Sequence, residues 1–413
     1  MFLTFCTVML VVPLFANLIE VCKSGCEYNS LSEAVTGSLP GDSILVYEGK
    51  YNEHGIIIDK QLSILGKNFP IIDGQEKGEI IRVEADDVLI TGLEIRNVGT
   101  SHIKDNAGIN IVNCNGCQVI NNKLKNTFFG IYLQKSSNCV IRNNEIIGEA
   151  VAEMSSGNAI HLWYCKNLEI VNNKCFKHRD GIYLEFVDSS RLENNLSRKN
   201  VRYGLHFMFS NYDTYQHNTF EENGSGVAVM FSKHINMTDN HFINNWGSSS
   251  YGLLLKDITD SKINNNEFRR NTTGIYAESA TRIELSNNDL QNNGWAIKML
   301  GSSMYNELKQ NNFIGNTIDL TTNASRNTNT YHQNYWSNYT GYDLDQDGYG
   351  DIPYKPIRLF SYIVGKVPEA IILVRSPLVD LLNFVEDTAP IFIPAGLEDP
   401  KPSMTRIIQN VRP

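Results

Sequence analysis

A pair of neighbouring asparagines, or a close equivalent, recurs along most of the chain at a spacing near 22 residues. Successive pairs begin 22, 29, 22, 23, 22, 25, 23 and 24 residues apart, at Asn121/Asn122, Asn143/Asn144, Asn172/Asn173, Asn194/Asn195, His217/Asn218, Asp239/Asn240, Asn264/Asn265, Asn287/Asn288 and Asn311/Asn312. A glycine followed by an apolar–x–apolar triplet keeps step with the pairs, as in GINI at residue 108 and GIYL at residues 130 and 181. Self-similarity at such a period is typical of a solenoid.

The repeated units alternate apolar and polar residues over short stretches that end in Asn, Gly and Ser, a pattern that indicates strands separated by turns. The chain contains 48 asparagines, 41 of them between residues 101 and 350, and asparagine favours turns over helices. A leucine-rich repeat would need a leucine skeleton, which these units lack. We therefore expect an all-β fold, a right-handed parallel β-helix, with the Asn pairs stacked as ladders at the turns of successive coils.

The chain divides into four expected segments. Residues 1–17 form an apolar run like the core of an export signal, although no Lys or Arg precedes Lys23; a retained anchor is the alternative. Residues 22–320 are expected to form the β-helix, with a short capping helix at residues 30–35. Residues 321–365 are expected to form an acidic loop and cap, and residues 366–413 a helix and tail. Export places the chain outside the cytoplasm, and a net charge of −9 argues against a nucleic-acid partner.

The cysteines are compatible with disulfides outside the cytoplasm. Cys22 and Cys26 lie together before the first coil, where a local bridge would staple the end of the chain. Cys117 and Cys139 take the same position on adjacent coils, so a bridge between them is a second candidate. Cys114 and Cys117 form a C-x-x-C motif, which is a weak zinc signal without further ligands. Stacked, unbonded cysteines inside the coils are the alternative to both.

The strand after each glycine carries outward side chains at the second and fourth positions after that glycine. Because coils stack in register, these positions form two rows on one face. The first row is Asn110, Tyr132, His161, Tyr183, His206, Ala228, Leu254, Tyr276 and Lys298. The second row is Val112, Gln134, Trp163, Glu185, Met208, Met230, Lys256 and Glu278.

His206, Met208 and Met230 are the candidate copper ligands on this face, with His161 and His234 as weaker candidates. Thioether and imidazole groups suit soft Cu(I), whereas Zn(II) prefers thiolates or carboxylates. An apolar patch that docks a partner protein through adaptable methionines is the alternative interpretation, and a shallow sugar-binding groove is the third.

Hydrolase or lyase chemistry on such a fold needs two acids, or an acid and a base, in one groove. Glu185 and Glu278 lie about four coils apart in the predicted register, and no other two acids converge. The chain also has no G-x-x-x-x-G-K-[ST] motif for nucleotide. The sequence therefore predicts no catalytic residues, and a carbohydrate-binding or polysaccharide-degrading β-helix is the runner-up function.

An acidic segment follows the last coil. Its aspartates match ligand positions 1, 3, 5 and 9 of a calcium loop, at Asp343, Asp345, Asp347 and Asp351. Gly348 stands at the glycine position of the loop, but Tyr354 replaces the bidentate glutamate. Two interpretations fit this motif equally well. The loop is either a structural Ca²⁺ site that takes one ligand from outside the motif or an acidic turn that holds no ion.

A helix is predicted to begin at Ser376 and Pro377, with the serine as N-cap and the proline in the first turn. Apolar residues follow at i, i+3, i+4 and i+7, at Leu378, Leu381, Leu382 and Val385, and Pro390 limits the helix end. We expect this helix, with Arg375 before it, either to pack back on the solenoid or to dock on a membrane partner.

Two stretches of the solenoid, RDGIYLEFVDSSRLENNLSRKNVRYGLHFMFSNYDTYQHNTF and GVAVMFSKHINMTDNHFINNWGSSSYGLLLKDI, closely resemble the NosD family. The segment NYWSNYTGYDLDQDGYGDIPY and the VRSPLVDLL…DPKP tail resemble the same family, so the resemblance covers nearly the whole mature chain. NosD proteins are periplasmic accessory proteins for assembling the copper centre of nitrous oxide reductase.

The resemblance implies a solenoid seated on an ABC transporter that pairs a permease with an ATPase, at the outer face of the cytoplasmic membrane. It implies that a lipoprotein copper chaperone delivers Cu(I), carried transiently and destined for the tetranuclear copper–sulfide site of the reductase. It also implies that residues 374–390 are the transporter-docking element. The resemblance assigns no copper ligands, so His206, Met208 and Met230 rest on the stacking of the coils alone.

Overall fold

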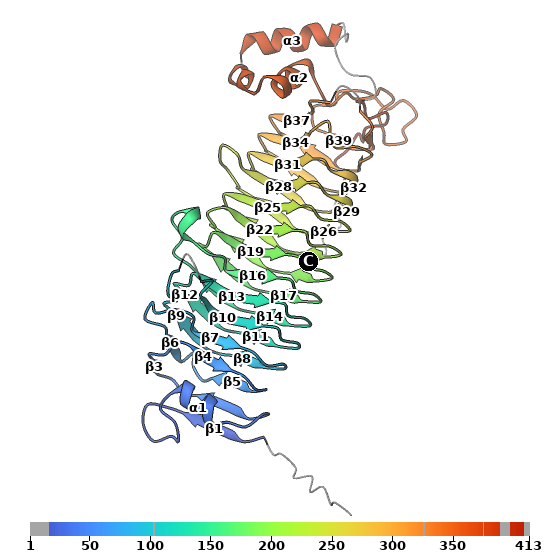
Figure 1. Ribbon diagram of the computed structural model, residues 1–413. Coiled ribbons are helices and arrows are strands. Elements are labelled where there is room, and N and C mark those ends of the chain that lie inside the picture. The colour runs from blue at the N-terminus through green and yellow to red at the C-terminus, as the bar shows by residue number, and fades with distance from the viewer. Residues whose placement is uncertain (1–15, 102–103, 325–326, 375, 389–396, 409–413) are drawn as a thin grey trace, which may run out of the picture.

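The computed structural model describes residues 16–101, 104–324, 327–374, 376–388 and 397–408. Within these residues, short strands form three parallel sheets of 14, 13 and 12 strands, each running the length of an elongated solenoid (Figure 1). The predicted all-β parallel β-helix is confirmed. The apolar tract of residues 1–15, which is most of the signal-like segment, lies outside the described residues, as do Arg375 and Pro390.

Each complete coil contributes one strand to each sheet, and the incomplete coils at the two ends account for the unequal numbers of strands. Sheet A contains, in order, β1 (Leu18–Val21), β2 (Ser43–Val46), β5 (Ser63–Gly66), β8 (Leu89–Thr91), β11 (Gln118–Ile120), β14 (Val140–Arg142), β17 (Glu169–Val171), β20 (Arg191–Glu193), β23 (Thr214–Gln216), β26 (Asn236–Thr238), β29 (Thr259–Asn264), β32 (Thr281–Ser286), β35 (Glu307–Lys309) and β38 (Thr330–His332). Sheet B contains β3 (Lys50–Tyr51), β6 (Ile71–Asp73), β9 (Glu94–Arg96), β12 (Lys123–Lys125), β15 (Glu145–Ile147), β18 (Lys174–Phe176), β21 (Leu196–Arg198), β24 (Thr219–Glu221), β27 (His241–Ile243), β30 (Glu267–Arg269), β33 (Asp289–Gln291), β36 (Asn312–Ile314) and β39 (Tyr335–Trp336). Sheet C contains β4 (Ile56–Ile58), β7 (Ile81–Val83), β10 (Ala107–Val112), β13 (Phe129–Gln134), β16 (Ile160–Trp163), β19 (Asp180–Glu185), β22 (Tyr203–Met208), β25 (Ser225–Met230), β28 (Tyr251–Lys256), β31 (Thr273–Glu278), β34 (Trp295–Met299) and β37 (Ile318–Thr321).

The asparagine pairs mark the turn from sheet A to sheet B. The first member of a pair takes a left-handed backbone, as Asn121 does at φ 56°, and the second turns its amide inward. The inward amides hydrogen-bond from coil to coil in one ladder, which runs through Asn122, Asn144, Asn173, Asn195, Asn218, Asn240, Asn266, Asn288, Asn311 and Asn334. Two of the predicted pairs are wrong by one residue, because the observed left-handed and inward-facing residues are Asn265 and Asn266 in one coil and Gln310 and Asn311 in another.

A second asparagine ladder, whose members recur at the same spacing but do not belong to the Asn pairs, lies at the turn from sheet B to sheet C. Its buried members are Asn200, Asn223, Asn245, Asn271, Asn293 and Asn316. His178 precedes them in the same line, since its backbone N–H donates to Asn200 Oδ1 at 3.0 Å. Each side-chain amide also donates to a main-chain carbonyl of a neighbouring coil, so the ladders satisfy buried backbone groups at two corners of every coil.

Stacked apolar side chains fill the space between the sheets. Phe220, Phe242 and Phe268 stack on successive coils, and the cysteines at positions 114, 117, 139, 165 and 175 are buried and unbonded. The candidate bridge between Cys117 and Cys139 is therefore wrong. Cys22 and Cys26 form a disulfide with an S–S distance of 2.02 Å.

Helices cover both ends of the solenoid (Figure 1). At the start, α1 (Leu31–Gly37) begins at the N-cap Ser30, whose side chain accepts from Glu33 N. At the other end, α2 (Leu359–Lys366) lies against β37, and the 3₁₀ turn η2 (Pro368–Leu373) leads to α3 (Pro377–Thr388), which packs on α2. A further 3₁₀ turn, η1 (Glu153–Ser155), lies in the longest coil. No helix in the described part of the chain combines the length and apolar character needed to cross a bilayer.

The segment 397–408 returns to the solenoid and closes its last coil. Asp399 is fully buried and accepts hydrogen bonds from Gln333 N, Asn334 N, Asn334 Nδ2 and Trp336 Nε1. Its carboxylate thus takes the place that the next asparagine of the first ladder would occupy. The described residues of the predicted segment 366–413 therefore contain two parts, the C-terminal helix and a returning segment that pairs with the end of the β-helix through isolated bridges at Asp399 and Ser403.

Candidate functional site

The two predicted rows of side chains lie in register on sheet C. The first row pairs Cα by Cα through Asn110, Tyr132, His161, Tyr183, His206, Ala228, Leu254, Tyr276 and Lys298. The second pairs through Val112, Gln134, Trp163, Glu185, Met208, Met230, Lys256 and Glu278. The stacking therefore brings His206, Met208 and Met230 together on one face of neighbouring coils.

His206, near the centre of β22, is far less exposed than its outward position suggests. The rings of Tyr183 and Tyr203 lie beside it, each with its centroid 4.9 Å from that of the imidazole, and only 5% of His206 is exposed. Its Nε2 atom is shielded from solvent and has no hydrogen-bond partner among the described residues. Because an unpaired buried polar atom is costly, Nε2 marks a position at which a ligand would be stabilising.

Asp180 and Arg202 hold the other nitrogen of His206. Its Nδ1 atom lies 3.4 Å from Arg202 Nη2 and 3.7 Å from Asp180 Oδ2. Arginine can only donate, so Arg202 favours the tautomer with hydrogen on Nε2, whereas Asp180 favours the tautomer with hydrogen on Nδ1. A metal bound at Nε2 requires the second tautomer, in which the carboxylate orients the ring as carboxylates do behind many metal-bound histidines.

Asp180 is a buried carboxylate surrounded by donors. Arg202 donates through Nε to Oδ1 at 2.9 Å and through Nη2 to Oδ2, and Tyr203 N lies 3.2 Å from Oδ1. Burial by itself would raise the pKa of Asp180, but the hydrogen bonds from Arg202 and His206 hold it at about 2. Asp180 is therefore ionised near neutral pH and balances the Arg202 guanidinium.

Met208 and Met230 are direct neighbours on β22 and β25, and both are half-buried. The Tyr183 hydroxyl donates to Met208 Sδ at 3.5 Å. Burial and the nearby Glu185 raise the pKa of Tyr183 to about 12, so this hydroxyl keeps its proton. His206 and Met208 lie two residues apart on the same side of β22, and Met230 pairs with Met208 on the next coil, so one imidazole and two thioethers occupy adjacent positions of the sheet.

The weaker candidates lie in different surroundings. Arg179 donates to Asn158 Oδ1, which fixes the Asn158 amide so that its Nδ2 donates to His161 Nδ1 at 3.4 Å. The neutral His161 ring therefore carries its hydrogen on Nε2, and no ring nitrogen has a free lone pair for a metal. Burial, with a contribution from Arg179, lowers the pKa of His161 to about 3. His234 lies in the turn between β25 and β26, where it stacks on Tyr212 away from sheet C. Neither joins the cluster around His206.

An exposed row of aromatic rings borders the methionines, and the sequence-based rows miss it. Tyr164, Phe186, Phe209 and Phe231 directly follow the second row on four coils and stack at centroid distances of 4.5, 5.0 and 5.0 Å. All four adopt positive φ, between 52° and 54°, a backbone that bulky residues rarely take. The signal was present in the sequence, since the same position after each glycine is aromatic on four successive coils.

The profile of the family described as "Periplasmic copper-binding protein (NosD)" matches residues 35–154 and 148–341. These matches cover well over half of the chain. The chain belongs to the NosD family. Two relatives bear the name "Probable ABC transporter binding protein NosD". The one from Stutzerimonas stutzeri is 28% identical over 380 residues, covering 87% of this chain and 85% of the relative. The one from Pseudomonas aeruginosa is 28% identical over 378 residues, covering 86% and 87%.

Solved structures share the fold of this NosD-family chain at low sequence identity. The catalytic unit of a thermostable GH87 α-1,3-glucanase from Streptomyces thermodiastaticus superposes with a TM-score of 0.60 at 12% identity, covering 76% of this chain and 67% of that chain. This likeness shows the solenoid fold alone. On sheet C, Glu185 and Glu278 are four coils apart in the register, as predicted, so they form no acid pair of the kind that glycoside hydrolysis requires.

The acidic loop of this NosD-family chain gathers part of the predicted calcium motif. Carboxylate oxygens of Asp343, Asp345 and Asp347 lie within 4.8 Å of one another, the one such cluster of three among the described residues. Asp351 is not part of this cluster, and its carboxylate accepts a hydrogen bond from the main-chain N–H of Leu344 in the same loop at 2.7 Å. Lys401 Nζ lies 3.0 Å from Asp347 Oδ2, so an ammonium group already balances part of the charge of the loop.

The C-terminal helix begins at Pro377, as predicted, but the predicted capping bond is wrong. Ser376 Oγ is shielded and makes no hydrogen bond within the described structure, while the Ser376 carbonyl accepts from Val379 N at 3.0 Å. Val379 is buried in the cluster that joins α3 to α2. Three of the four predicted apolar positions are exposed and Leu382 is half-buried, with exposed fractions of 49% for Leu378, 58% for Leu381 and 45% for Val385. The helix therefore presents an apolar face away from the solenoid.

Proposed function

We propose that this NosD-family chain is an extracytoplasmic accessory protein that handles Cu(I) during assembly of the copper–sulfide centre of nitrous oxide reductase. The ligands that we propose are His206 Nε2 and the thioethers of Met208 and Met230, with copper as a transient cargo. The observation that carries the proposal is the shielded, unpartnered Nε2 atom beside two methionines in register. The description of the family as copper-binding supports it.

The donor set fits Cu(I) better than other metals. Thioethers and neutral imidazoles are soft or intermediate donors and carry no charge, so they suit a monovalent soft ion. Asp180 lies behind His206 and can hold its Nδ1–H, which leaves the lone pair of Nε2 free. The half-buried position of both methionines lets a partner reach the sulfur atoms, as a site that receives and releases its cargo requires.

The proposed partners follow from the family to which the chain belongs. The relatives are named as ABC transporter binding proteins, and we propose a permease and an ATPase of this class as partners, with ATP hydrolysis in the ATPase. A lipoprotein copper chaperone would deliver Cu(I), and the reductase would receive it. The protein would then act at the outer face of the cytoplasmic membrane, held there by its partner, without catalysing a reaction itself.

Replacing His206, Met208 and Met230 together by alanine is expected to weaken Cu(I) binding by about 100-fold or more, because no described donor on sheet C replaces them. Competition titration with a colorimetric Cu(I) chelator measures the affinity. A matched triple variant, H217A/M154A/M304A, removes the same atoms from exposed positions outside sheet C and is expected to bind Cu(I) like the parent protein. Equal affinity in all three proteins would exclude the proposed ligands.

A docking surface for a partner protein is the second candidate function of this face. The observation in its favour is the stack of four aromatic rings beside the methionines, in which Phe186 is half-buried and Tyr164, Phe209 and Phe231 are exposed. The same triple variant separates the two functions, because a surface that only docks loses affinity for the partner and keeps its affinity for Cu(I).

We propose that the exposed apolar face of α3 docks on the transporter permease. Leu381→Glu places a charge at the most exposed leucine of this face and is expected to weaken binding to the detergent-solubilised transporter by about 10-fold or more. Ile57→Glu, at a similarly exposed apolar position on β4 at the other end of the solenoid, is the control and is expected to bind like the parent. Surface plasmon resonance measures both, and equal loss in the two variants would contradict a specific role for α3.

We also propose that the acidic loop binds Ca²⁺ through Asp343, Asp345 and Asp347. Lys401 competes with the ion for Asp347, so Ca²⁺ must displace this ammonium group. Calorimetric titration of Ca²⁺ into metal-free protein tests the site, and absence of a heat signal would leave the loop as an acidic turn closed by Lys401.

A further inference from the structure

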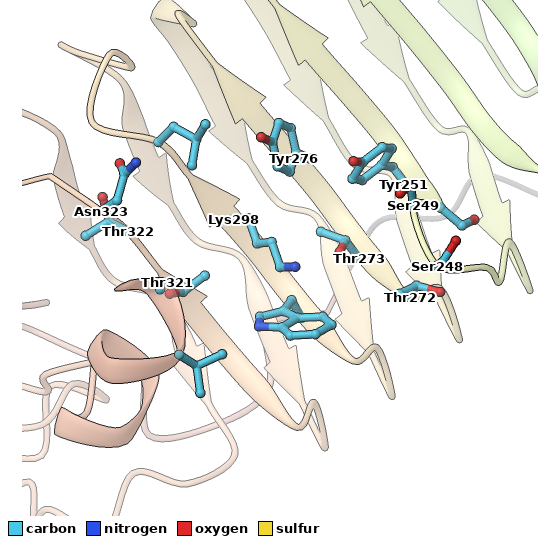
Figure 2. Close-up of a pocket in the computed structure, with 15 residues that line it drawn as sticks. Ser248, Ser249, Tyr251, Thr272, Thr273, Tyr276, Lys298, Thr321, Thr322 and Asn323 are labelled. Atoms are coloured by element: carbon cyan, nitrogen blue, oxygen red, sulfur yellow. The ribbon is translucent and has the colours of Figure 1, made fainter. Parts of the chain in front are cut away.

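A cavity of about 330 Å³ lies between the last coils of sheet C and helix α2. Tyr251 and Tyr276 line one side of it, and Thr321, Thr322 and Asn323 line the other (Figure 2). Lys298 lies between the two sides, since its strand position pairs with Tyr276 on one neighbouring coil and with Thr321 on the next. Such a volume is at the lower end of the range for small-molecule sites.

Lys298 forms no ion pair with a carboxylate in the described part of the chain. Its ammonium nitrogen lies 3.4 Å from the centroid of the Trp295 ring, so the indole face is its closest stabilising contact. Burial lowers the pKa of Lys298 to about 8, and no carboxylate among the described residues counters this effect. The side chain is still mostly protonated at neutral pH, and a partly buried charge of this kind gains most from an anion.

Two further polar atoms of the lining are unsatisfied. Trp295 Nε1 and Ser250 Oγ are shielded from solvent and have no hydrogen-bond partner among the described residues. The remaining lining is rich in hydroxyl groups, contributed by Ser248, Ser249, Thr272, Thr273, Thr321 and Thr322. A single cation, unpaired donors, two tyrosine rings and a hydroxyl-rich rim together favour an anionic ligand that carries hydroxyl groups of its own.

We propose that this cavity binds a small hydroxylated carboxylate, of the size of one hexuronic acid, with its carboxylate on the Lys298 ammonium. The site is separate from the proposed copper ligands, because Lys298 lies four coils along sheet C from His206. It does not depend on the copper proposal.

The same cavity adjoins helix α2, on which α3 packs. Val364 and Gly365 of α2 close it, and α2 is fastened to the last coil by Thr321 Oγ1, which donates to the Ser361 carbonyl at 3.0 Å. Lys366 Nζ adds a contact to the Asn323 carbonyl at 3.1 Å. A ligand between β34 and α2 therefore contacts both sides of this junction and slows the opening of α2 from the solenoid.

Calorimetric titration of the full chain with D-glucuronate at pH 7 tests the proposal, with D-glucose as the neutral match and acetate as the bare anion. We expect glucuronate to bind at least about 10-fold more tightly than either comparison compound. Lys298→Gln is expected to weaken glucuronate binding by about 10-fold or more, and Lys298→Arg to retain it. Lys256→Gln, two coils away on sheet C and outside the cavity, is expected to bind like the parent.

Two further readouts separate binding at Lys298 from a general effect. Affinity should fall as pH rises through about 8, where Lys298 loses its proton. Hydrogen exchange of the α2 amides should slow on adding glucuronate. The proposal is overturned if no heat of binding appears up to about 10 mM glucuronate, or if glucose or acetate binds as tightly as glucuronate. It is also overturned if the Lys298→Gln variant binds glucuronate like the parent while its unfolding midpoint shows that it is folded.

Discussion

Replacing Asn240 by alanine is expected to lower the free energy of unfolding by about 4 kcal/mol, because one buried amide joins three coils. Its Oδ1 accepts from the main-chain and side-chain N–H groups of Asn218, and its Nδ2 donates to Tyr215 O, Thr238 O and Asn266 Oδ1. Alanine leaves the main-chain and side-chain N–H groups of Asn218 without this acceptor, at a position that is shielded from water. Urea unfolding followed by circular dichroism measures the loss.

Asn236 provides the control for this prediction, since it belongs to the same coil and its side chain is exposed. Asn236→Ala is expected to change the unfolding free energy by no more than about 0.5 kcal/mol. If both variants unfold at the same urea concentration, the ladder does not contribute the stability that its geometry indicates.

Replacing Asp180 by asparagine is expected to cost about 3–5 kcal/mol of stability, because it removes the buried counter-ion of the partly buried Arg202 guanidinium. Only the exposed carboxylate of Glu153, 3.2 Å from Arg202 Nη1, then remains to balance this charge. The substitution also removes the acceptor that can hold Nδ1–H of His206, so Cu(I) affinity is expected to fall by about 10-fold or more. Thermal unfolding and chelator competition measure the two effects on one protein. A fall in stability without any change in Cu(I) affinity would show that Asp180 does not position His206 for a metal.

The stability effect of Asp180 has a definite pH dependence. Its pKa in the folded protein is about 2, below the ordinary value of 3.8 for an aspartate, so the ionised form is stabilised by folding. The contribution is fully present above pH 3.8 and is lost as the pH falls towards 2. The stability difference between parent and Asp180→Asn should therefore be constant near neutral pH and shrink below about pH 4.

Asp260 and Arg282 form the matched control pair. Arg282 donates to Asp260 through Nε at 2.6 Å and Nη2 at 2.7 Å, which repeats the Arg202–Asp180 geometry at an exposed position. Exposed ion pairs contribute little. Asp260→Asn should leave both stability and Cu(I) affinity near the parent values, and a loss equal to that of Asp180→Asn would mean that burial is not the cause.

Much of the fold could be predicted because one residue type repeats at one place in every coil. The spacing of the Asn pairs gives the length of each coil, and the glycine–apolar triplets show which side chains point outward. Counting residues from these two marks therefore predicts that His206, Met208 and Met230 lie on one face of neighbouring coils. Counting failed where three asparagines adjoin, at residues 264–266, because the sequence does not show which amide turns inward. The backbone conformation decides it, since Asn265 is left-handed at φ 57° and Asn266 is the ladder member.

The surroundings of the candidate site could not be predicted in the same way. Alternation places His206 outside the coil, but its burial depends on how the rings of Tyr183 and Tyr203 lean over it. The Asp180–Arg202 pair joins residues 22 positions apart on adjacent coils, and its geometry depends on rotamers that no repeat encodes. The cavity at Lys298 depends on the docking of α2, a helix with no counterpart in the repeat.

The return of residues 397–408 to the solenoid gives the helical pair a mechanical role. The chain leaves the last coil near Tyr354, forms α2 and α3, and comes back to pair with Tyr354 at Asp399, which seals the end of the first asparagine ladder. The helices are thus a loop clamped at both ends and not a free tail. A force applied to α3 would therefore act on both attachments of this loop and be transmitted through Asp399 to the hydrogen-bonded amides of the first asparagine ladder.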